Sequence, residues 1–371
     1  MTAPLLDLKD IGKSFVVKRS LFGKPLQTLR ALDGIDLTLK RGETLAIVGE
    51  SGCGKSTLAR VVLRLIDPSE GDIVFDGETI TAFAPPALRA FRRKAQLIFQ
   101  DPFASLNPRM TVGDILSEPL MLHQVVPAKD RGARVGELLT QVGLKPQDAK
   151  RFPHEFSGGQ RQRIAIARAL AVEPDLIICD EPVSALDVSI RAQILNLLAD
   201  LKAKLGLSLL FISHDLSVVR SVADRVAVMY LGRVVEEGRA EDVFANPRHP
   251  YTRALVNAVP LPVPRRGSSR PLLQGDVPSP IAPPPGCHFQ TRCPFVIDAC
   301  PTGRPPLSPC GGEIHRSACI RHSELPQYDS PMRDHDTAPV LKKLMAAFVR
   351  PSDAQQKNEM TLKGDTSCAL D

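Results

Sequence analysis

The sequence contains no tryptophan, and aromatic residues of all kinds make up only 5% of it. Basic clusters do occur, as in FRRK (Phe91 to Lys94) and PRRGSSR (Pro264 to Arg270), but no aromatic side chains interleave with them. Proteins that bind nucleic acid usually combine a basic surface with aromatic rings on which bases stack. We therefore interpret the net charge of +6 as a mild surface bias and expect no nucleic-acid partner.

Long apolar runs are also missing, since no run approaches the roughly 18 residues that a membrane-spanning helix needs. The first ten residues, MTAPLLDLKD, contain acidic side chains and no long apolar core, so we expect no secretory signal. We therefore expect a cytoplasmic protein whose contact with a membrane comes through a partner. The 371 residues, 43% of them hydrophobic, are enough for about two domains with packed cores.

Proline marks a boundary along the chain. About half of the 33 prolines lie between Pro247 and Pro309, and the periodic helix and strand patterns fade in the same stretch. We predict a first domain over residues 1–245 and a smaller C-terminal module over residues 246–325. Residues 326–371 form a polar tail that we expect to be largely disordered, with a helical pattern only in LKKLMAAFV, residues 341–349.

Within the first domain, apolar runs of strand length alternate with helical patterns. The runs are TLAIV (44–48), QLIF (96–99), LIIC (176–179), SLLFIS (208–213) and RVAVMY (225–230). Such alternation predicts an α/β fold with a largely parallel sheet that is buried on both faces. Between QDPFASLNP and SGGQRQR the pattern is helical with turn signals, which suggests a helical subdomain inserted into the sheet domain.

The stretch GESGCGKST, Gly49 to Thr57, matches the phosphate-binding pattern G-x-x-x-x-G-K-[ST] and follows an apolar run. Its glycines let backbone amides point at a triphosphate, and the helix expected over residues 55–64 adds its positive N-terminal end. In this motif Lys55 reaches the outer phosphates and Ser56 ligates magnesium. A chance glycine turn is the weaker alternative in this strand–loop–helix setting. The motif predicts a nucleotide site without separating a kinase, GTPase, helicase or transport motor.

Three further segments suit such a site. Asp180 and Glu181 follow the apolar run LIIC, and in P-loop enzymes a strand-end acid holds magnesium while the next carboxylate orients or deprotonates water. His214 follows LLFIS and is placed to contact a γ-phosphate, although a lone histidine is more often structural. SGGQ, residues 157–160, opens a helix whose free amides suit a second phosphate, and by itself it is more often a capped helix start.

Taken in order, GESGCGKST, IFQDP, SGGQRQR, LIICDEP, SALD and ISHD resemble the motifs of the ATP-binding subunits of ABC transporters, and they cover the whole first domain. The resemblance implies a P-loop ABC ATPase domain with a mostly parallel sheet, a β-subdomain and an inserted helical subdomain. It also implies that two such domains associate head to tail and enclose two ATP molecules, each between one P-loop and the partner's signature.

The resemblance also implies residue roles. The residues that contact ATP are implied to be Phe15, which stacks on adenine, the P-loop residues Gly49, Glu50, Ser51, Gly52, Cys53, Gly54, Lys55, Ser56 and Thr57, and the signature residues Ser157, Gly158, Gly159 and Gln160. The magnesium ligands are implied to be Ser56, Gln100 and Asp180. The catalytic group is implied to comprise Glu181, His214 and Gln100, and Ser184 to Asp187 are implied to contact the second ATPase domain.

Two stretches narrow the resemblance further. IFQDPFASLNPRMTV and NPRHPYTRALVNAVP are similar to segments of the ATPases of dipeptide and oligopeptide importers. The implied partners are a second, different ATPase subunit, two transmembrane permeases and an extracytoplasmic peptide-binding protein, at the cytoplasmic face of a bacterial inner membrane. The alternatives are an importer of nickel, glutathione or an opine in the same subfamily and, less well matched, a soluble ABC ATPase of DNA repair or translation.

Cysteines gather in the proline-rich module with the spacing C-x5-C-x6-C-x18-C, and Cys310 lies between the last two of them. The four are Cys287, Cys293, Cys300 and Cys319. A reducing cytoplasm argues against disulfides, and soft thiolates suit zinc or an iron–sulfur cluster. Paired C-x2-C, which is usual for structural zinc, is absent. The resemblance implies a [4Fe-4S] cluster, with zinc or unligated thiols as the alternatives.

Overall fold

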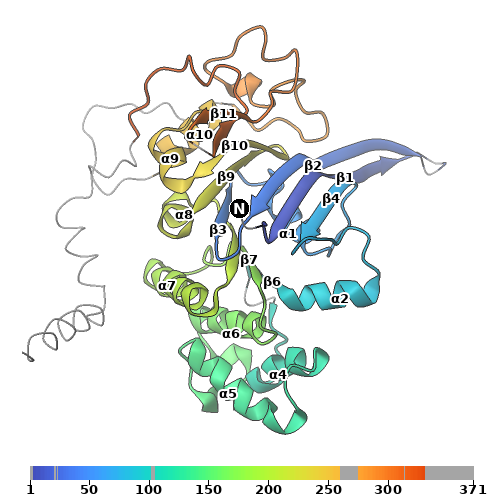
Figure 1. Ribbon diagram of the computed structural model, residues 1–371, viewed down its shortest axis with the longest axis vertical. Coiled ribbons are helices and arrows are strands. Elements are labelled where there is room, and N and C mark those ends of the chain that lie inside the picture. The colour runs from blue at the N-terminus through green and yellow to red at the C-terminus, as the bar shows by residue number, and fades with distance from the viewer. Residues whose placement is uncertain are drawn as a thin grey trace, which may run out of the picture.

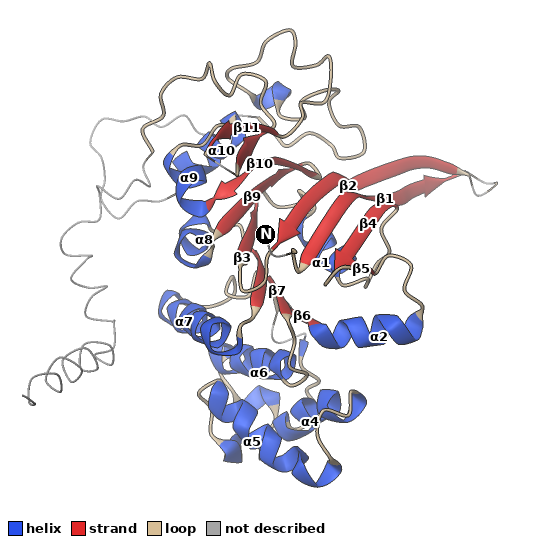
Figure 2. Cartoon of the chain, viewed as in Figure 1, coloured by secondary structure: helices blue, strands red, loops and turns tan. Residues whose placement is uncertain are grey.

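The computed structural model describes residues 3–20, 22, 24–101, 105–259, 275–312 and 314–330. An antiparallel sheet of four strands and a mixed sheet of eight strands form the frame of the part described (Figure 1; Figure 2). The smaller sheet has the order β2-β1-β4-β5 and the larger one the order β11-β12-β10-β9-β3-β8-β7-β6. The expected α/β fold with a β-subdomain is thereby confirmed.

The smaller sheet is built mainly from two long strands joined as a hairpin. Its strands are β1 (Leu6–Arg19), β2 (Pro25–Leu39), β4 (Glu70–Phe75) and β5 (Glu78–Thr79). Apolar residues of β1 and β2, such as Leu8, Ile11 and Ile35, are buried, while the far ends of the two strands, residues 16–19 and 25–28, are exposed. The buried ends pack toward helix α1 (Lys55–Val62) in one apolar cluster, so the β-subdomain covers the start of this helix.

The centre of the larger sheet consists of parallel strands whose residues are all buried or nearly so. These are β3 (Thr44–Val48), β6 (Ala95–Ile98), β7 (Leu176–Asp180), β8 (Ser208–Ile212) and β9 (Arg225–Tyr230). Continuous apolar runs are typical of parallel strands covered on both faces, which is why the sequence marks these strands so clearly. β6 lies one residue earlier than predicted, and β9 has the predicted bounds.

Helices cover the faces of this sheet, and a group of helices extends from one end of it (Figure 2). Besides α1 they are α2 (Pro85–Lys94), α4 (Val112–Leu122), α5 (Arg131–Gln141), α6 (Gly158–Leu170), α7 (Val188–Leu205), α8 (Leu216–Val222), α9 (Ala240–Ala245) and α10 (Pro250–Asn257). α4, α5 and α6 pack through Leu116, Leu120, Leu138 and Ile164. They form the expected helical subdomain, between β6 and β7 in the chain.

The C-terminal residues continue the sheet. Strand β10 (Arg233–Arg239) pairs with the short strand β12 (His315–Ser317), which in turn pairs with β11 (Ser308–Gly311). Residues 326–330, which the sequence suggested as the start of a disordered tail, pack on α9 and α10, because Tyr328 and Ser330 are buried there and hydrogen-bonded. The rest of that tail, with the helical pattern at 341–349, lies outside the described residues.

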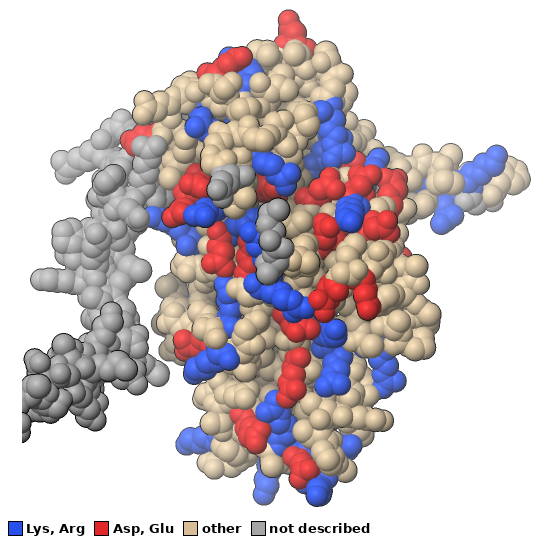
Figure 3. Space-filling model, in the orientation of Figure 1, with Lys and Arg blue, Asp and Glu red and all other residues tan. Residues whose placement is uncertain are grey.

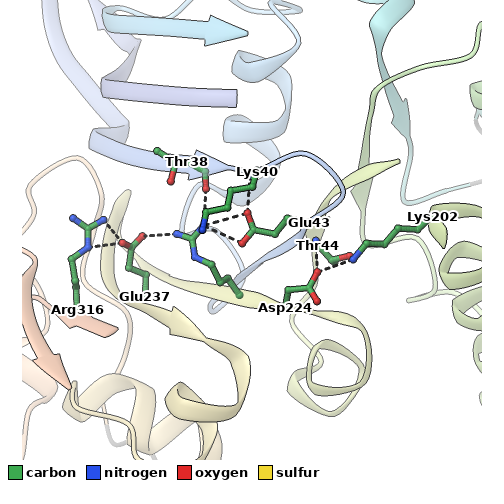
Figure 4. A network of polar contacts seen from close by, with 9 residues as sticks. Thr38, Lys40, Glu43, Thr44, Lys202, Asp224, Glu237 and Arg316 are labelled. Atoms are coloured by element: carbon green, nitrogen blue, oxygen red, sulfur yellow. Dashed lines mark hydrogen bonds and ion pairs between the residues drawn. The ribbon is translucent and has the colours of Figure 1, made fainter. Parts of the chain in front are cut away.

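A polar network fastens the sheet to its neighbours (Figure 4). Arg225 on β9 donates to Glu43 at 3.2 Å and to the carbonyl of Thr38 at 3.0 Å, and it lies 3.9 Å from Glu237, which pairs with Arg316 of β12. All of the acidic partners are buried. Because a buried charge must be paired, this network constrains how the β-subdomain and the C-terminal strands sit on β9.

None of the helices in the described ranges is both long and apolar enough to cross a bilayer. Lys and Arg are interspersed with Asp and Glu over the face drawn in Figure 3.

Candidate nucleotide site

A cavity of about 540 Å³ lies where the central parallel strands end. The predicted residues Phe15, Ser51, Gly52, Gly54, Lys55, Ser56, Thr57, Gln100, Glu181 and His214 all line it. The loops that follow β3, β7, β8 and β9 meet there because the carboxyl ends of parallel strands share one edge of the sheet. The fold thus brings most of the predicted site together.

The P-loop requires a glycine at position 54, where strand β2 passes close to it. Gly54 has φ +107°, and a Cβ at this position would lie 2.4 Å from the carbonyl oxygen of Ala31. Only glycine combines this backbone conformation with such a close approach. Lys55, the next residue, is 6% exposed and donates to the carbonyls of Gly49 at 2.7 Å and Glu50 at 2.9 Å. Its ammonium group therefore lies inside the loop, at the start of helix α1.

Ser56 and Asp180 form a pair that suits a magnesium ion. Ser56 lines the cavity, whereas Asp180 lines the adjoining groove, which shares Ser56 and Gln100 with the cavity. The Ser56 hydroxyl donates to Asp180 Oδ1 at 3.0 Å. Asp180 is 8% exposed at the end of β7, and burial raises its pKa, with the neighbouring charge of Glu181 acting in the same direction. A buried carboxylate whose ionised form is disfavoured gains from a divalent cation beside it. The donor set and its electrostatics therefore fit Mg²⁺.

Glu181 lies between the other two predicted catalytic residues. One of its carboxylate oxygens accepts from Gln100 Nε2 at 2.9 Å, and the other lies 3.1 Å from His214 Nδ1. Glu181 has φ +48°, in the left-handed region, and its backbone N–H donates to Ile212 of β8. A non-glycine residue held in this conformation is a strained feature of the kind that clusters at functional sites. The strain turns the Glu181 carboxylate into the cavity beside the P-loop.

The signature segment lies elsewhere in the described structure. Ser157 caps α6, and its backbone N–H donates to Gln160 Oε1 at 3.0 Å. Gly159 packs against α7 so closely that a Cβ would lie 2.4 Å from a side-chain carbon of Ile190. None of Ser157, Gly158, Gly159 and Gln160 is among the residues that line the cavity. Within one chain, the signature therefore does not complete the nucleotide site.

The cavity also has walls that the sequence did not reveal. They are Leu29, Arg30, Ala31, Leu231, Gly232 and Pro280. These residues come from β2, the β9–β10 turn and the C-terminal module, and none belongs to a motif. Conversely, Gly49, Glu50 and Cys53 of the P-loop do not line the cavity. Sequence analysis could not tell the two groups apart, because position in the motif does not say which way a residue faces.

The four predicted metal-ligating cysteines line one small apolar cavity together with Phe289 and His249. Its volume of about 20 Å³ suffices for about one water molecule. Cys310 is not part of its wall and contacts the carbonyl of His315 instead. Burial raises the pKa of both Cys293 and Cys319 to about 11, which favours the neutral thiols in the absence of a cation.

No group of three or more His, Cys, Asp or Glu side chains in the described residues is arranged to hold a metal ion. The structure therefore does not support the [4Fe-4S] cluster that the resemblance implied, nor the zinc site that was its alternative. The donor atoms are of the right kind, but in this arrangement they enclose only about 20 Å³, so the thiols would have to move apart to hold a metal.

Two family models match the chain. The model described as ABC transporter matches residues 32–184, and the model described as Oligopeptide/dipeptide transporter, C-terminal region matches residues 235–300. The first spans the P-loop through Asp180 and Glu181, and the second spans most of β10, all of α10 and three of the four clustered cysteines.

Two curated relatives come from Escherichia coli. The oligopeptide transport ATP-binding protein OppF is 51% identical over 322 residues, which cover 85% of this chain and 96% of that protein. The dipeptide transport ATP-binding protein DppF is 48% identical over 324 residues, with 87% and 97% covered. Among solved structures, the dimeric cassette MJ0796 matches with a TM-score of 0.57 and 30% identity, covering 63% of this chain and 98% of that one.

Proposed function

This chain belongs to the ATP-binding proteins of ABC transporters, in the group that carries the oligopeptide/dipeptide transporter C-terminal region, and from that premise we propose how it works. It is an ATPase subunit that powers the import of dipeptides or oligopeptides. The observation that carries this function is the single cavity in which the P-loop, Gln100, Glu181 and His214 face one another.

Each side chain in the cavity has a task in ATP hydrolysis. Lys55 turns from the Gly49 and Glu50 carbonyls to the outer phosphates when ATP enters, and the first amides of α1 face the same phosphates. Ser56, Gln100 and Asp180 would hold a magnesium ion, which would supply positive charge to neutralise the phosphates. Glu181 accepts a proton from the attacking water, and His214 donates to the γ-phosphate oxygen that gains charge. Phe15 stacks on the adenine ring.

We propose that a second ATPase chain supplies the signature segment for this cavity. The position of Ser157 and Gly158 outside the chain's own cavity supports a head-to-tail pair, and the solved cassette MJ0796 is described as dimeric. The resemblance to the dipeptide type favours a different chain as the partner. Residues 184–187 begin three positions after Glu181 and belong to the same contact.

The remaining partners are two transmembrane permeases and an extracytoplasmic peptide-binding protein, with this subunit docked at the cytoplasmic face of the bacterial inner membrane. A groove of about 600 Å³ beside Gln100 supports a permease contact, because the apolar side chains of Leu65, Leu97 and Phe99 line it. Phe99 is 43% exposed, and an exposed aromatic ring is a common anchor of an interface. Residues 1–245 then form the ATPase domain and residues 246–325 a module specific to this group.

Transport by the reconstituted complex tests the function. The chain, its permeases and its partner ATPase are placed in liposomes, and uptake of a labelled dipeptide is measured with ATP, without ATP and with the Lys55→Ala variant. We expect uptake with ATP and the wild-type chain only. Uptake of nickel, glutathione or an opine in place of peptides would select the corresponding alternative, and ATP hydrolysis that never depends on permeases would favour a soluble ABC ATPase.

We propose that the four clustered cysteines bind a metal. The [4Fe-4S] cluster is the main proposal and a zinc ion is the alternative. Their meeting at one cavity supports the ligand set, and the small volume requires that the thiols move apart when metal binds. Elemental analysis of protein purified without oxygen distinguishes the two metals. About four irons per chain with matching sulfide indicate the cluster, and one zinc per chain indicates a zinc site. Absence of both in protein expressed with iron supplied overturns the proposal. A Cys293→Ser variant that keeps its metal overturns the ligand assignment.

A further inference from the structure

Glu50, the second residue of the P-loop, is held by side chains from the C-terminal module. Its carboxylate accepts two hydrogen bonds from the Arg292 guanidinium, at 2.8 and 3.1 Å. Its backbone N–H donates to the Tyr251 hydroxyl at 2.8 Å. Only its carbonyl is bound from within the motif, by the Lys55 ammonium at 2.9 Å and the Cys53 N–H at 3.3 Å. The conformation of the loop at this residue therefore depends on two residues that lie about 200 positions or more away in the sequence.

Arg292 is fixed in turn by aromatic side chains. It is 5% exposed, its Nη1 lies 3.4 Å from the Tyr230 hydroxyl, and its guanidinium carbon lies 5.9 Å from the Tyr230 ring centre and 6.0 Å from that of Phe289. Cation–π contacts at these distances stabilise a desolvated guanidinium. The hydrogen bonds that Arg292 donates to Glu50 raise the pKa of Arg292 above its already high ordinary value, against the effect of burial. The cation is therefore permanent.

The aromatic side chains next to Arg292 are tightly packed. Tyr230, Tyr251 and Phe289 form an aromatic cluster with ring centres 4.6 to 5.4 Å apart, and all three are at most 1% exposed. Arg292 ends the short turn Gln290–Arg292, which begins directly after Phe289. Figure 1 shows the C-terminal segment, drawn in orange, lying over the β9–β10 end of the larger sheet. Arg292 and Tyr251, which contact Glu50, are not among the residues that line the nucleotide cavity.

The charge of Glu50 gives this contact a consequence for nucleotide binding. A carboxylate in a loop that binds a triphosphate repels the ligand unless a cation neutralises it. A bidentate guanidinium pair both neutralises the carboxylate and fixes its direction. The direction matters here, since Glu50 faces Arg292 and is not among the residues that line the nucleotide cavity.

We propose that Arg292 is a positioning residue of the nucleotide site, which pairs with Glu50, turns that carboxylate away from the phosphates and holds the start of the P-loop in its binding conformation. The inference rests on the proposed function, in which the cavity of about 540 Å³ binds ATP. It makes the C-terminal module a working part of the ATPase. Arg292 itself does not touch the nucleotide.

Three variants test the pair: Arg292→Gln, Glu50→Gln and the double variant. Glutamine keeps hydrogen-bonding atoms and much of the size, so each change chiefly removes charge. In the assembled transporter we expect Arg292→Gln to raise the KM for ATP by about tenfold while kcat stays within about twofold. The double variant, which no longer has an unpaired carboxylate, should return KM to within about threefold of wild type. The Kd for ATP of the full-length chain should follow the same order.

Arg321→Gln is the matched control, because Arg321 lies in the same module, pairs with Glu324 at 2.9 Å and donates to the carbonyl of Phe295. It should leave KM unchanged. If Arg292 served only to stabilise the fold, the Arg292→Gln variant would contain less folded protein and its apparent kcat would fall. Its KM would stay the same, because KM is a property of the folded fraction alone. Should Arg292→Gln fail to fold, Tyr251→Phe removes only the acceptor of the Glu50 N–H, and we expect it to raise KM by about threefold.

Wild-type KM and Kd in Arg292→Gln, or in Tyr251→Phe where that variant is needed, overturn the inference. A double variant no better than Arg292→Gln alone overturns it as well, because the effect would then not pass through Glu50. These results differ from a failure of the proposed function. In that case the wild-type chain itself would not bind ATP, and Lys55→Ala would change nothing.

Discussion

Replacing Glu181 with glutamine separates catalysis from binding more sharply than any other single change in the cavity. The two carboxylate oxygens each have one partner, Gln100 Nε2 at 2.9 Å and His214 Nδ1 at 3.1 Å. A glutamine in the same place directs its oxygen to Gln100 and its amide nitrogen to His214. Both contacts can therefore persist, and the side chain loses only its charge and its ability to take a proton.

The size of the effect follows from that loss. General-base catalysis contributes about 100- to 10,000-fold, which corresponds to about 3 to 5 kcal/mol of the activation free energy. We expect kcat of Glu181→Gln in the assembled transporter to fall by at least about 100-fold. The Kd for ATP should change by less than about threefold, since Glu181 adjoins the phosphates without supplying a phosphate-binding charge. Bound ATP then stays unhydrolysed, and the closed pair of ATPase chains accumulates.

Steady-state hydrolysis, equilibrium ATP binding and light scattering with ATP measure the three quantities. Glu137→Gln serves as the control, because Glu137 lies on α5 and pairs at the surface with Arg134. That variant should hydrolyse ATP like the wild type. Turnover of Glu181→Gln near the wild-type rate would refute the role of Glu181 as the base. Loss of ATP binding would instead show that the residue holds the P-loop in place.

Three further predictions concern the same molecule. Lys55→Ala should weaken ATP binding itself by about tenfold or more, as measured by calorimetry, because a charge that faces the phosphates is lost; an unchanged Kd would contradict the role. Ser157→Asp keeps a good N-cap on α6 but adds a negative charge, so in a complex with one variant chain it should impair hydrolysis at the partner's P-loop and spare the chain's own. Burial lowers the pKa of His249 and His288 to about 4, below the value of roughly 6.5 that a histidine has in the unfolded chain. The free energy of unfolding should therefore fall as the pH drops from about 6.5 toward 4. Between pH 7 and pH 5 the expected loss is about 2 kcal/mol per histidine. His249→Asn keeps a cap at the start of α10 and should reduce that pH dependence by about half in denaturant titrations; an unaltered slope would contradict the assignment.

Much of the ATPase fold could be predicted from local sequence. TLAIV and RVAVMY are strands with the predicted bounds, because a parallel strand buried on both faces needs an unbroken apolar run. The family resemblance placed Glu181 and His214 at one site, and the fold brings them together because each follows such a strand and the ends of parallel strands lie at one edge. The short strands β11 and β12 carry no such signal. They have four and three residues and pair at the edge of the sheet, where neighbouring strands rather than their own composition make them strands.

The sequence by itself determined the chemistry of this protein, because a P-loop, a strand-end Asp–Glu pair and a switch histidine bring their reactive groups within short, ordered motifs. Tertiary structure decided which way those groups face and what surrounds them. Nothing in the sequence distinguishes Glu50 from the other variable positions of the P-loop. Only the fold brings its carboxylate to Arg292, which is 242 residues away in the sequence. Pro280 reaches the nucleotide cavity in the same way, through a segment that has no motif of its own. Long-range contacts of this kind depend on how the sheet and the C-terminal module pack, and packing is a property of the whole chain.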